Sequence, residues 1–176
     1  MTRKQLEHII RASAATADVN EIVVIGSQSI LGSFPDAPPE LTQSIEADVF
    51  PKSSPERSIV IDGAIGELSL FHETFGYYAH GVDDTTATLP DGWTGRLVPI
   101  HTSTEATGWC LDPHDLAVSK LAAGREKDIE FVSGMLRAGL ISVDVVRKRL
   151  AETPRLPAER AAIAMAWIAS FGPARE

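Results

Sequence analysis

The chain has 176 residues, of which 44% are hydrophobic and 23% charged, an ordinary globular balance that excludes disorder over most of its length. Its net charge of -8 excludes a broad basic surface for duplex DNA, because phosphate binding requires clustered Lys and Arg. Cys110 is the single cysteine, which excludes an internal disulfide and a cysteine-based zinc site. No segment approaches the ~20 apolar residues of a membrane helix and the N-terminus lacks signal-peptide features, so we expect a cytoplasmic protein.

The first fifty residues show one helical pattern followed by two strand patterns. Apolar residues at helical spacing predict a helix from about Lys4 to Ala17. Residues 21–25, EIVVI, are a continuous apolar run rich in β-branched residues, which predicts a central strand covered on both faces. The segment SIEADVF alternates apolar and polar residues, so it predicts a second strand with Glu46 and Asp48 on its polar face.

The next segments carry weaker patterns. RSIVIDG, residues 57–63, fits either a strand or the start of a helix. RLVPIHT predicts an edge strand because Pro99 cannot donate a ladder hydrogen bond, and GWCLD predicts one more short strand. The intervening residues 71–93 are aromatic and rich in glycine and turn residues, so no regular element is predicted there.

Helical patterns dominate from residue 112 onward. Residues 112–139 predict a helix that Gly124 divides in two, and residues 142–153 and 157–171 predict two more. We therefore expect an α/β core over residues 1–110 and a C-terminal helical part over residues 111–176, packed on the core.

The two acidic residues of the second strand suggest a metal site. Strand geometry puts Glu46 and Asp48 on one face, about 6–7 Å apart at Cα, where their charges repel and favour a divalent cation. Hard oxygen ligands suit Mg²⁺ or Mn²⁺ completed by water and substrate phosphates. Gly26, which follows the central strand, lets a phosphate approach the backbone, and the Ser27 hydroxyl can hydrogen-bond its oxygens.

The segments VVIGSQSIL, SIEADVF and DPHDLAVSKLAAGREKD resemble the nucleotidyltransferase superfamily of DNA polymerase β, and more narrowly the small bacterial proteins related to AbiEii-type toxins. The resemblance implies an α/β fold with a mixed sheet flanked by helices. It also implies that Glu46 and Asp48 are catalytic metal ligands and that Gly26 and Ser27 hold the triphosphate of an NTP.

The resemblance further implies that Lys120 contacts a phosphate and that Asp128 orients a partner residue or acts as a base. The alternative for both is a solvated helical face with local ion pairs. A third catalytic carboxylate is implied but not evident, and Asp62 is the best candidate, with Asp91 behind it, unless His101 substitutes.

The histidines show no metal-ligand spacing, so we expect structural roles for His72, His80, His101 and His114.

The functional expectation is transfer of a nucleoside monophosphate from an NTP to an RNA, protein or small-molecule acceptor. The resemblance also suggests a toxin–antitoxin or phage-defence setting and leaves room for a protein partner. The alternative is a non-catalytic binding or regulatory module that keeps the nucleotidyltransferase fold.

Overall fold

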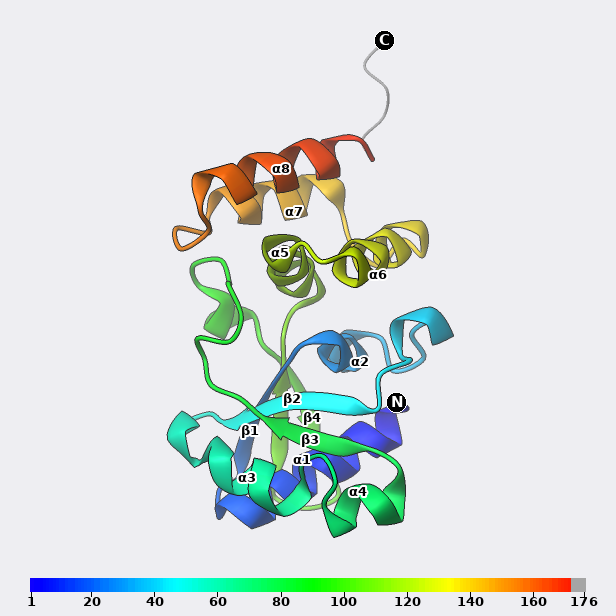
Figure 1. Ribbon diagram of the computed structural model, residues 1–176, viewed down its shortest axis with the longest axis vertical. Helices are drawn as coiled ribbons and strands as arrows, with labels where there is room; N and C mark the ends of the chain where they lie inside the picture. The colour runs from blue at the N-terminus through cyan, green and yellow to red at the C-terminus, as the bar shows by residue number, and fades with distance from the viewer. Residues whose placement is uncertain (172–176) are drawn as a thin grey trace. The chain divides into compact units, whose positions relative to one another are not determined.

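The computed structural model describes residues 1–171 and divides the chain into two compact units. The first unit comprises residues 1–87 and 97–112 and contains the sheet (Figure 1). The second comprises residues 88–96 together with the chain from Pro113 onward and contains the C-terminal helices. The predicted combination of a mixed α/β part with C-terminal helices is confirmed.

One five-stranded mixed sheet forms the centre of the first unit. Its strands are β1 (Glu21–Ile25), β2 (Glu46–Pro51), β3 (Tyr78–Gly81), β4 (Val98–His101) and β5 (Thr107–Cys110). Their order is β3-β2-β1-β5-β4, so the apolar run EIVVI is the central strand and the Pro99 segment is an edge strand, both as predicted. β1 runs antiparallel to β2 and parallel to β5, β3 is parallel to β2, and β4 is antiparallel to β5.

Two helices cover one face of this sheet (Figure 1): α1 (Arg3–Ala17) and α3 (Ser58–Ile65). A Cβ atom at Gly108 would collide with Ile10 of α1, and a Cβ atom at Gly81 would collide with the backbone of Ser58 in α3. Glycine at these two strand positions therefore lets both helices approach the sheet closely. The ambiguous segment RSIVIDG belongs to α3 and is helical.

The aromatic segment without a predicted element contains both a helix and a strand. Helix α4 (Leu70–Phe75) begins after Ser69, whose hydroxyl accepts a hydrogen bond from the His72 amide, and it ends at Gly76 in the left-handed region with φ 75°. Strand β3 follows directly and pairs with β2, which lies some thirty residues earlier in the chain. Pairing over this separation leaves no local pattern, so β3 was not predicted.

The remaining short elements connect these strands and helices. Helix α2 (Ile30–Ser33) contacts β4 and β5. Within residues 1–171, four single turns of 3-10 helix complete the connections: Ser27–Ser29, Pro39–Leu41, Pro55–Arg57 and Trp93–Arg96.

The described part of the second unit contains four α-helices, with α5 in contact with the other three. Its helices are α5 (Pro113–Ala123), α6 (Glu126–Arg137), α7 (Val143–Ala151) and α8 (Ala158–Ala169). Helix α5 packs against the other three, and Gly124, with φ 62°, separates α5 from α6 as the sequence predicted. None of the helices in residues 1–171 combines the length and the apolar character that crossing a membrane requires.

A buried ion-pair group joins residues 88–96 to these helices. Asp115 of α5 is fully buried and accepts hydrogen bonds from Arg96 Nε at 2.9 Å and Arg96 Nη2 at 3.1 Å. It also accepts one from Arg149 of α7 at 2.9 Å. Charge-assisted bonds to a buried carboxylate are strong, so they explain why this segment belongs to the helical unit.

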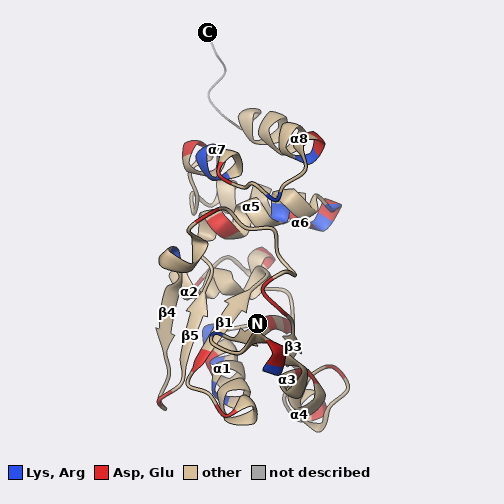
Figure 2. Ribbon diagram, turned by 90° about the vertical axis from the view of Figure 1, so that its left-hand side faces the viewer, with Lys and Arg blue, Asp and Glu red and all other residues tan. Residues whose placement is uncertain are grey.

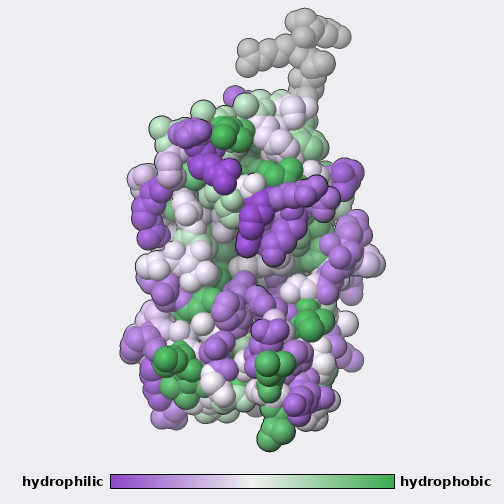
Figure 3. All heavy atoms as spheres, viewed as in Figure 1, coloured by the Kyte–Doolittle hydropathy of each residue, from purple (hydrophilic) through white to green (hydrophobic). Residues whose placement is uncertain are grey.

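Charged residues of both signs are spread along the part of the chain that the structure describes. Lys and Arg are dispersed among Asp and Glu in Figure 2, in keeping with the net charge of -8. Hydrophobic residues form separate groups among hydrophilic ones on the face shown in Figure 3.

Candidate active site

The acidic residues Glu46 and Asp48 lie on the face of the sheet opposite α1 and α3. Side chains alternate along β2, so these two point one way while Ala47 and Val49 point toward the helices. In the sheet register, Asp48 lies beside Ile25 of β1 and His80 of β3. The arrangement places both carboxylates directly beside the end of the central strand.

The turn after β1 lies against Asp48. Gly26 has φ 69°, in the left-handed region, and a Cβ atom there would collide with Asp48 Oδ2. Only glycine therefore permits this approach of the backbone to the carboxylate. The Ser29 hydroxyl donates a hydrogen bond to the Gly26 carbonyl at 2.7 Å and closes the turn that contains Ser27.

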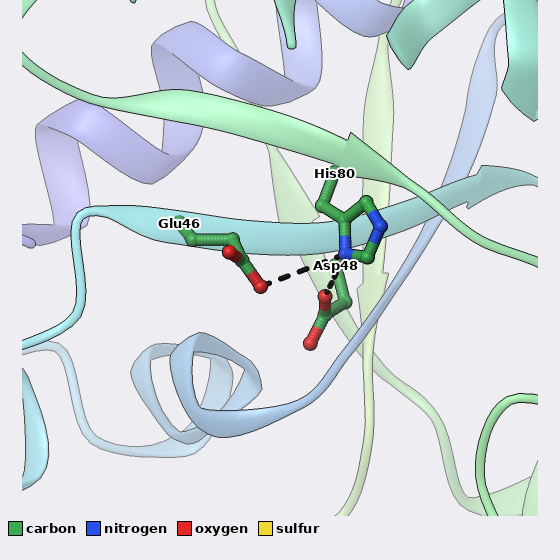
Figure 4. A group of neighbouring side chains, drawn as sticks. All are labelled: Glu46, Asp48 and His80. Carbon is green, nitrogen blue, oxygen red and sulfur yellow. Dashed lines mark hydrogen bonds and ion pairs between the residues drawn. The ribbon is translucent and has the colours of Figure 1, made fainter. Parts of the chain in front are cut away.

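A histidine completes the group. His80 Nδ1 lies 3.1 Å from Asp48 Oδ1 and 3.6 Å from Glu46 Oε1 (Figure 4). One ligand atom from each of the three residues lies within 4.8 Å of the others. Tyr78, two residues before His80 on the same face, donates a hydrogen bond to Glu46 Oε2 at 2.7 Å and orients that carboxylate.

The electrostatics of this group favour a cation. Burial raises the pKa of Asp48, the negative charge of Glu46 raises it further, and the hydrogen bond to His80 opposes both effects. Burial and the hydrogen bond to Glu46 also raise the pKa of the Tyr78 hydroxyl. Two carboxylates and an imidazole nitrogen in convergent positions are a donor set that fits a divalent cation.

The other candidates for a third carboxylate lie elsewhere. Asp62 is on α3 and accepts a hydrogen bond from the Gly81 amide at 3.2 Å, on the helix-covered face of the sheet. Because RSIVIDG is a helix packed on that face, Asp62 does not join Glu46 and Asp48. His101 lies on β4, at the opposite edge of the sheet from β3. Asp91 belongs to the second unit, where its amide donates to the Glu152 carbonyl.

Lys120 and Asp128 pair with each other inside the second unit. Asp128 is fully buried, and its oxygens lie 3.0 Å from Lys120 Nζ and 2.6 Å from Arg125 Nε. Burial acts to raise the pKa of Asp128, but the hydrogen bonds from Arg125 and Lys120 outweigh it and lower that pKa. These ion pairs agree with the alternative of local ion pairs between the helices.

A concave surface of about 770 Å³ lies at another place in the first unit. It is lined by the second half of α1 and by residues 104–106, and includes His8, Arg11 and Asn20. Within residues 1–171, the convergent metal-ligand group is the one at Glu46, so we place the candidate site there on the chemistry of its side chains.

Sequence reasoning missed three residues at or beside the site. Tyr78 and His80 are two residues apart on β3, just as Glu46 and Asp48 are on β2, so each pair projects from one face of its strand. The polar residues at this two-residue spacing were the available signal. Gln28 lies in the turn after Gly26, is buried, and its side-chain amide has no hydrogen-bond partner among the described residues. A buried amide without a hydrogen-bond partner lowers the stability of the folded chain, so a substitution at Gln28 can test this feature of the turn.

Comparison with known proteins identifies the family of the chain. The model of a family described as nucleotidyltransferase of unknown function (DUF6036) matches residues 4–167. No curated protein and no solved structure matches the sequence. The matched range includes the turn at Gly26, the acidic strand β2, the strand β3 and nearly all of the C-terminal helices.

Proposed function

We propose that this chain, which belongs to the family of nucleotidyltransferases of unknown function (DUF6036), transfers a nucleoside monophosphate from an NTP to an acceptor at Glu46 and Asp48. The observation that carries the proposal is the contact between Gly26 and the Asp48 carboxylate. It puts an open backbone turn, which can receive phosphate oxygens, beside two carboxylates that can hold a cation.

The proposed reaction is a displacement at phosphorus. An oxygen of the acceptor forms a bond to the α-phosphorus of the NTP, while the bond from that phosphorus to the bridging oxygen breaks. Pyrophosphate leaves with the bonding electron pair, and the acceptor proton passes to solvent. A bound Mg²⁺ or Mn²⁺ would neutralise phosphate charge and stabilise the attacking and leaving oxygens.

The residues of the chain have separate roles in this proposal. Glu46 and Asp48 hold the cation, and the Tyr78 hydroxyl keeps Glu46 directed toward it. Gly26 and Ser27 receive the triphosphate beside Asp48. We do not extend the proposal to Lys120 and Asp128, because their ion pairs within the helical unit account for them.

The acceptor is proposed as a class only: an RNA, a protein or a small molecule with a nucleophilic oxygen. The net charge of -8 disfavours a large RNA unless a basic partner assists. A toxin–antitoxin or phage-defence setting rests on the resemblance to AbiEii-type proteins alone.

A second candidate function is a non-catalytic module that binds a metal–nucleotide complex. One observation favours it. The convergent group in residues 1–171 consists of Glu46, Asp48 and His80, without the third carboxylate that the resemblance implies. Such a module would bind an NTP at this site and leave it intact.

The test is incubation of the chain with each α-³²P-labelled NTP, Mg²⁺ or Mn²⁺, and a cell extract, followed by identification of the labelled species. We expect a labelled product with the wild type that is missing with Asp48→Asn, because the variant loses a proposed metal ligand. Labelling by the extract's own enzymes is the same in both samples and serves as the baseline. Glu73→Gln removes an exposed carboxylate on α4 and is the matched control. Asp62→Asn should also keep activity, since Asp62 lies on the helix-covered face.

Thermal denaturation with metal and NTP separates the two candidates. A ligand at 100 times its Kd stabilises the folded state by about 2.7 kcal/mol, so binding is visible without turnover. Stabilisation that Asp48→Asn abolishes, together with no labelled product, would identify the non-catalytic module. Labelling that persists in Asp48→Asn would contradict the proposed site.

A further inference from the structure

We propose that His80 is a direct ligand of the metal at this site and that it makes the site prefer a first-row transition-metal dication such as Mn²⁺ over Mg²⁺. This inference rests on the proposed function, because it concerns the cation that Glu46 and Asp48 hold. It goes beyond that function by naming a nitrogen ligand and a metal preference.

The backbone positions His80 for this role. Strands β2 and β3 are parallel neighbours, and their register pairs Asp48 with His80 and Glu46 with Tyr78. Paired residues of adjacent strands project from the same face, so the imidazole and both carboxylates meet above the sheet (Figure 4). Rigid strands hold the three side chains, which favours a defined coordination site.

One oxygen of Glu46 and one oxygen of Asp48 lie near His80 Nδ1, so a cation between them could contact all three side chains. Tyr78 occupies Glu46 Oε2, and Oε1 is the oxygen that lies 3.6 Å from His80 Nδ1. Asp48 Oδ1 lies 3.1 Å from the same nitrogen. A cation bound by these three ligands would lie between Glu46 Oε1, Asp48 Oδ1 and His80 Nδ1.

Exposure is compatible with that exchange. The side chain of His80 is 50% exposed, and those of Glu46 and Asp48 are 38% and 26% exposed. Water and a substrate can therefore reach the cation and complete its coordination shell. A closed set of protein ligands would leave no position for a phosphate oxygen.

The nitrogen ligand determines the metal preference. Mg²⁺ is a hard cation that prefers oxygen ligands in near-octahedral geometry and keeps several of its waters. Imidazole nitrogen is a better ligand for first-row transition metals, whose affinities for such sites rise from Mn²⁺ toward Cu²⁺. The ratio of Mn²⁺ affinity to Mg²⁺ affinity should therefore be roughly ten-fold higher for a site with two carboxylates and one imidazole than for an all-oxygen site.

The experiment titrates the full chain with MnCl₂ in the absence of nucleotide. Electron paramagnetic resonance measures free Mn²⁺ and gives the Kd, and competition with MgCl₂ gives the preference. Electron spin-echo modulation of bound Mn²⁺ reports a coordinated imidazole through its ¹⁴N coupling. We expect that coupling in the wild type and its loss in His80→Asn.

Two further variants sharpen the result. His80→Asp creates an all-oxygen set and should reduce the preference for Mn²⁺ over Mg²⁺ by roughly ten-fold while keeping metal binding. His101→Asn removes an exposed histidine from β4, at the other edge of the sheet, and should leave the coupling and the preference unchanged. Circular dichroism of each variant confirms that it folds.

The possible failures are distinguishable. Mn²⁺ binding that is lost in Asp48→Asn but shows no ¹⁴N coupling in the wild type would overturn the role of His80 and leave the proposed function standing. An unchanged metal preference in His80→Asp would do the same. A wild type that binds no Mn²⁺, alone or with NTP, would overturn both proposals.

Discussion

The two units hold their acidic side chains in opposite ways. In the helical unit, Asp115 and Asp128 are fully buried, and each is hydrogen-bonded by two basic side chains. In the sheet unit, Glu46 and Asp48 lie side by side with a half-exposed histidine as their basic neighbour. The same functional group is thus neutralised in one unit and left with excess negative charge in the other.

This difference separates structure from function. A carboxylate surrounded by guanidinium and ammonium groups has its charge balanced within the fold. A pair that repel each other destabilises the metal-free fold and gains from an added cation. The pKa values follow the same division, since that of Asp128 is lowered and that of Asp48 is raised.

The largest effect on folding is expected for Asp115→Ala. It leaves Arg96 and Arg149 without their shared buried acceptor, which should lower the free energy of unfolding by about 3–5 kcal/mol. Urea denaturation followed by far-UV circular dichroism measures it. Asp144→Ala removes a carboxylate that is 92% exposed and should cost less than about 0.5 kcal/mol. Equal effects of the two substitutions would contradict the structural role of Asp115.

Asp128→Asn should destabilise the chain by about 2 kcal/mol at neutral pH, because Lys120 and Arg125 lose a charged acceptor. The folded pKa of Asp128 is lowered, so its contribution is present above the unfolded pKa of about 3.9 and is lost as pH falls through the folded pKa. Unfolding free energies measured from pH 7 to pH 2 should therefore converge for wild type and variant. A constant difference over that range would show that charge is not the cause.

Gln28→Met should raise the free energy of unfolding by about 1 kcal/mol, because it replaces a buried amide without partners by an apolar side chain of similar length. Thermal denaturation without ligand checks this expectation. Destabilisation would instead indicate that the amide makes a stabilising contact through bound water.

Asp48→Asn is expected to have the smallest effect on the free energy of unfolding. Its sign is opposite to that of the substitutions at the helical carboxylates. The folded pKa of Asp48 is raised, so its favourable contribution exists below the unfolded pKa and is lost as pH rises through the folded pKa. The amide should therefore stabilise the metal-free chain by up to about 1 kcal/mol at pH 7 and leave it unchanged near pH 3. A loss of stability at pH 7 would place Asp48 with the structural carboxylates.

Parts of the fold and of the site were predictable because their signals are local. The run EIVVI identified the central strand, Pro99 identified an edge, and Gly124 identified a helix boundary. Alternation along SIEADVF predicted that Glu46 and Asp48 share a face. The ambiguous RSIVIDG was decided by packing, because a short apolar run fits either a strand or a helix.

The sequence by itself determined that two carboxylates project from one face of one strand, since strand geometry alone requires it. Only the tertiary structure decided which residue accompanies them. Parallel pairing of β2 with β3 brings in His80, and packing of α3 on the other face removes Asp62. The physical reason is that both choices depend on contacts between segments distant in the chain, and no local periodicity records such contacts.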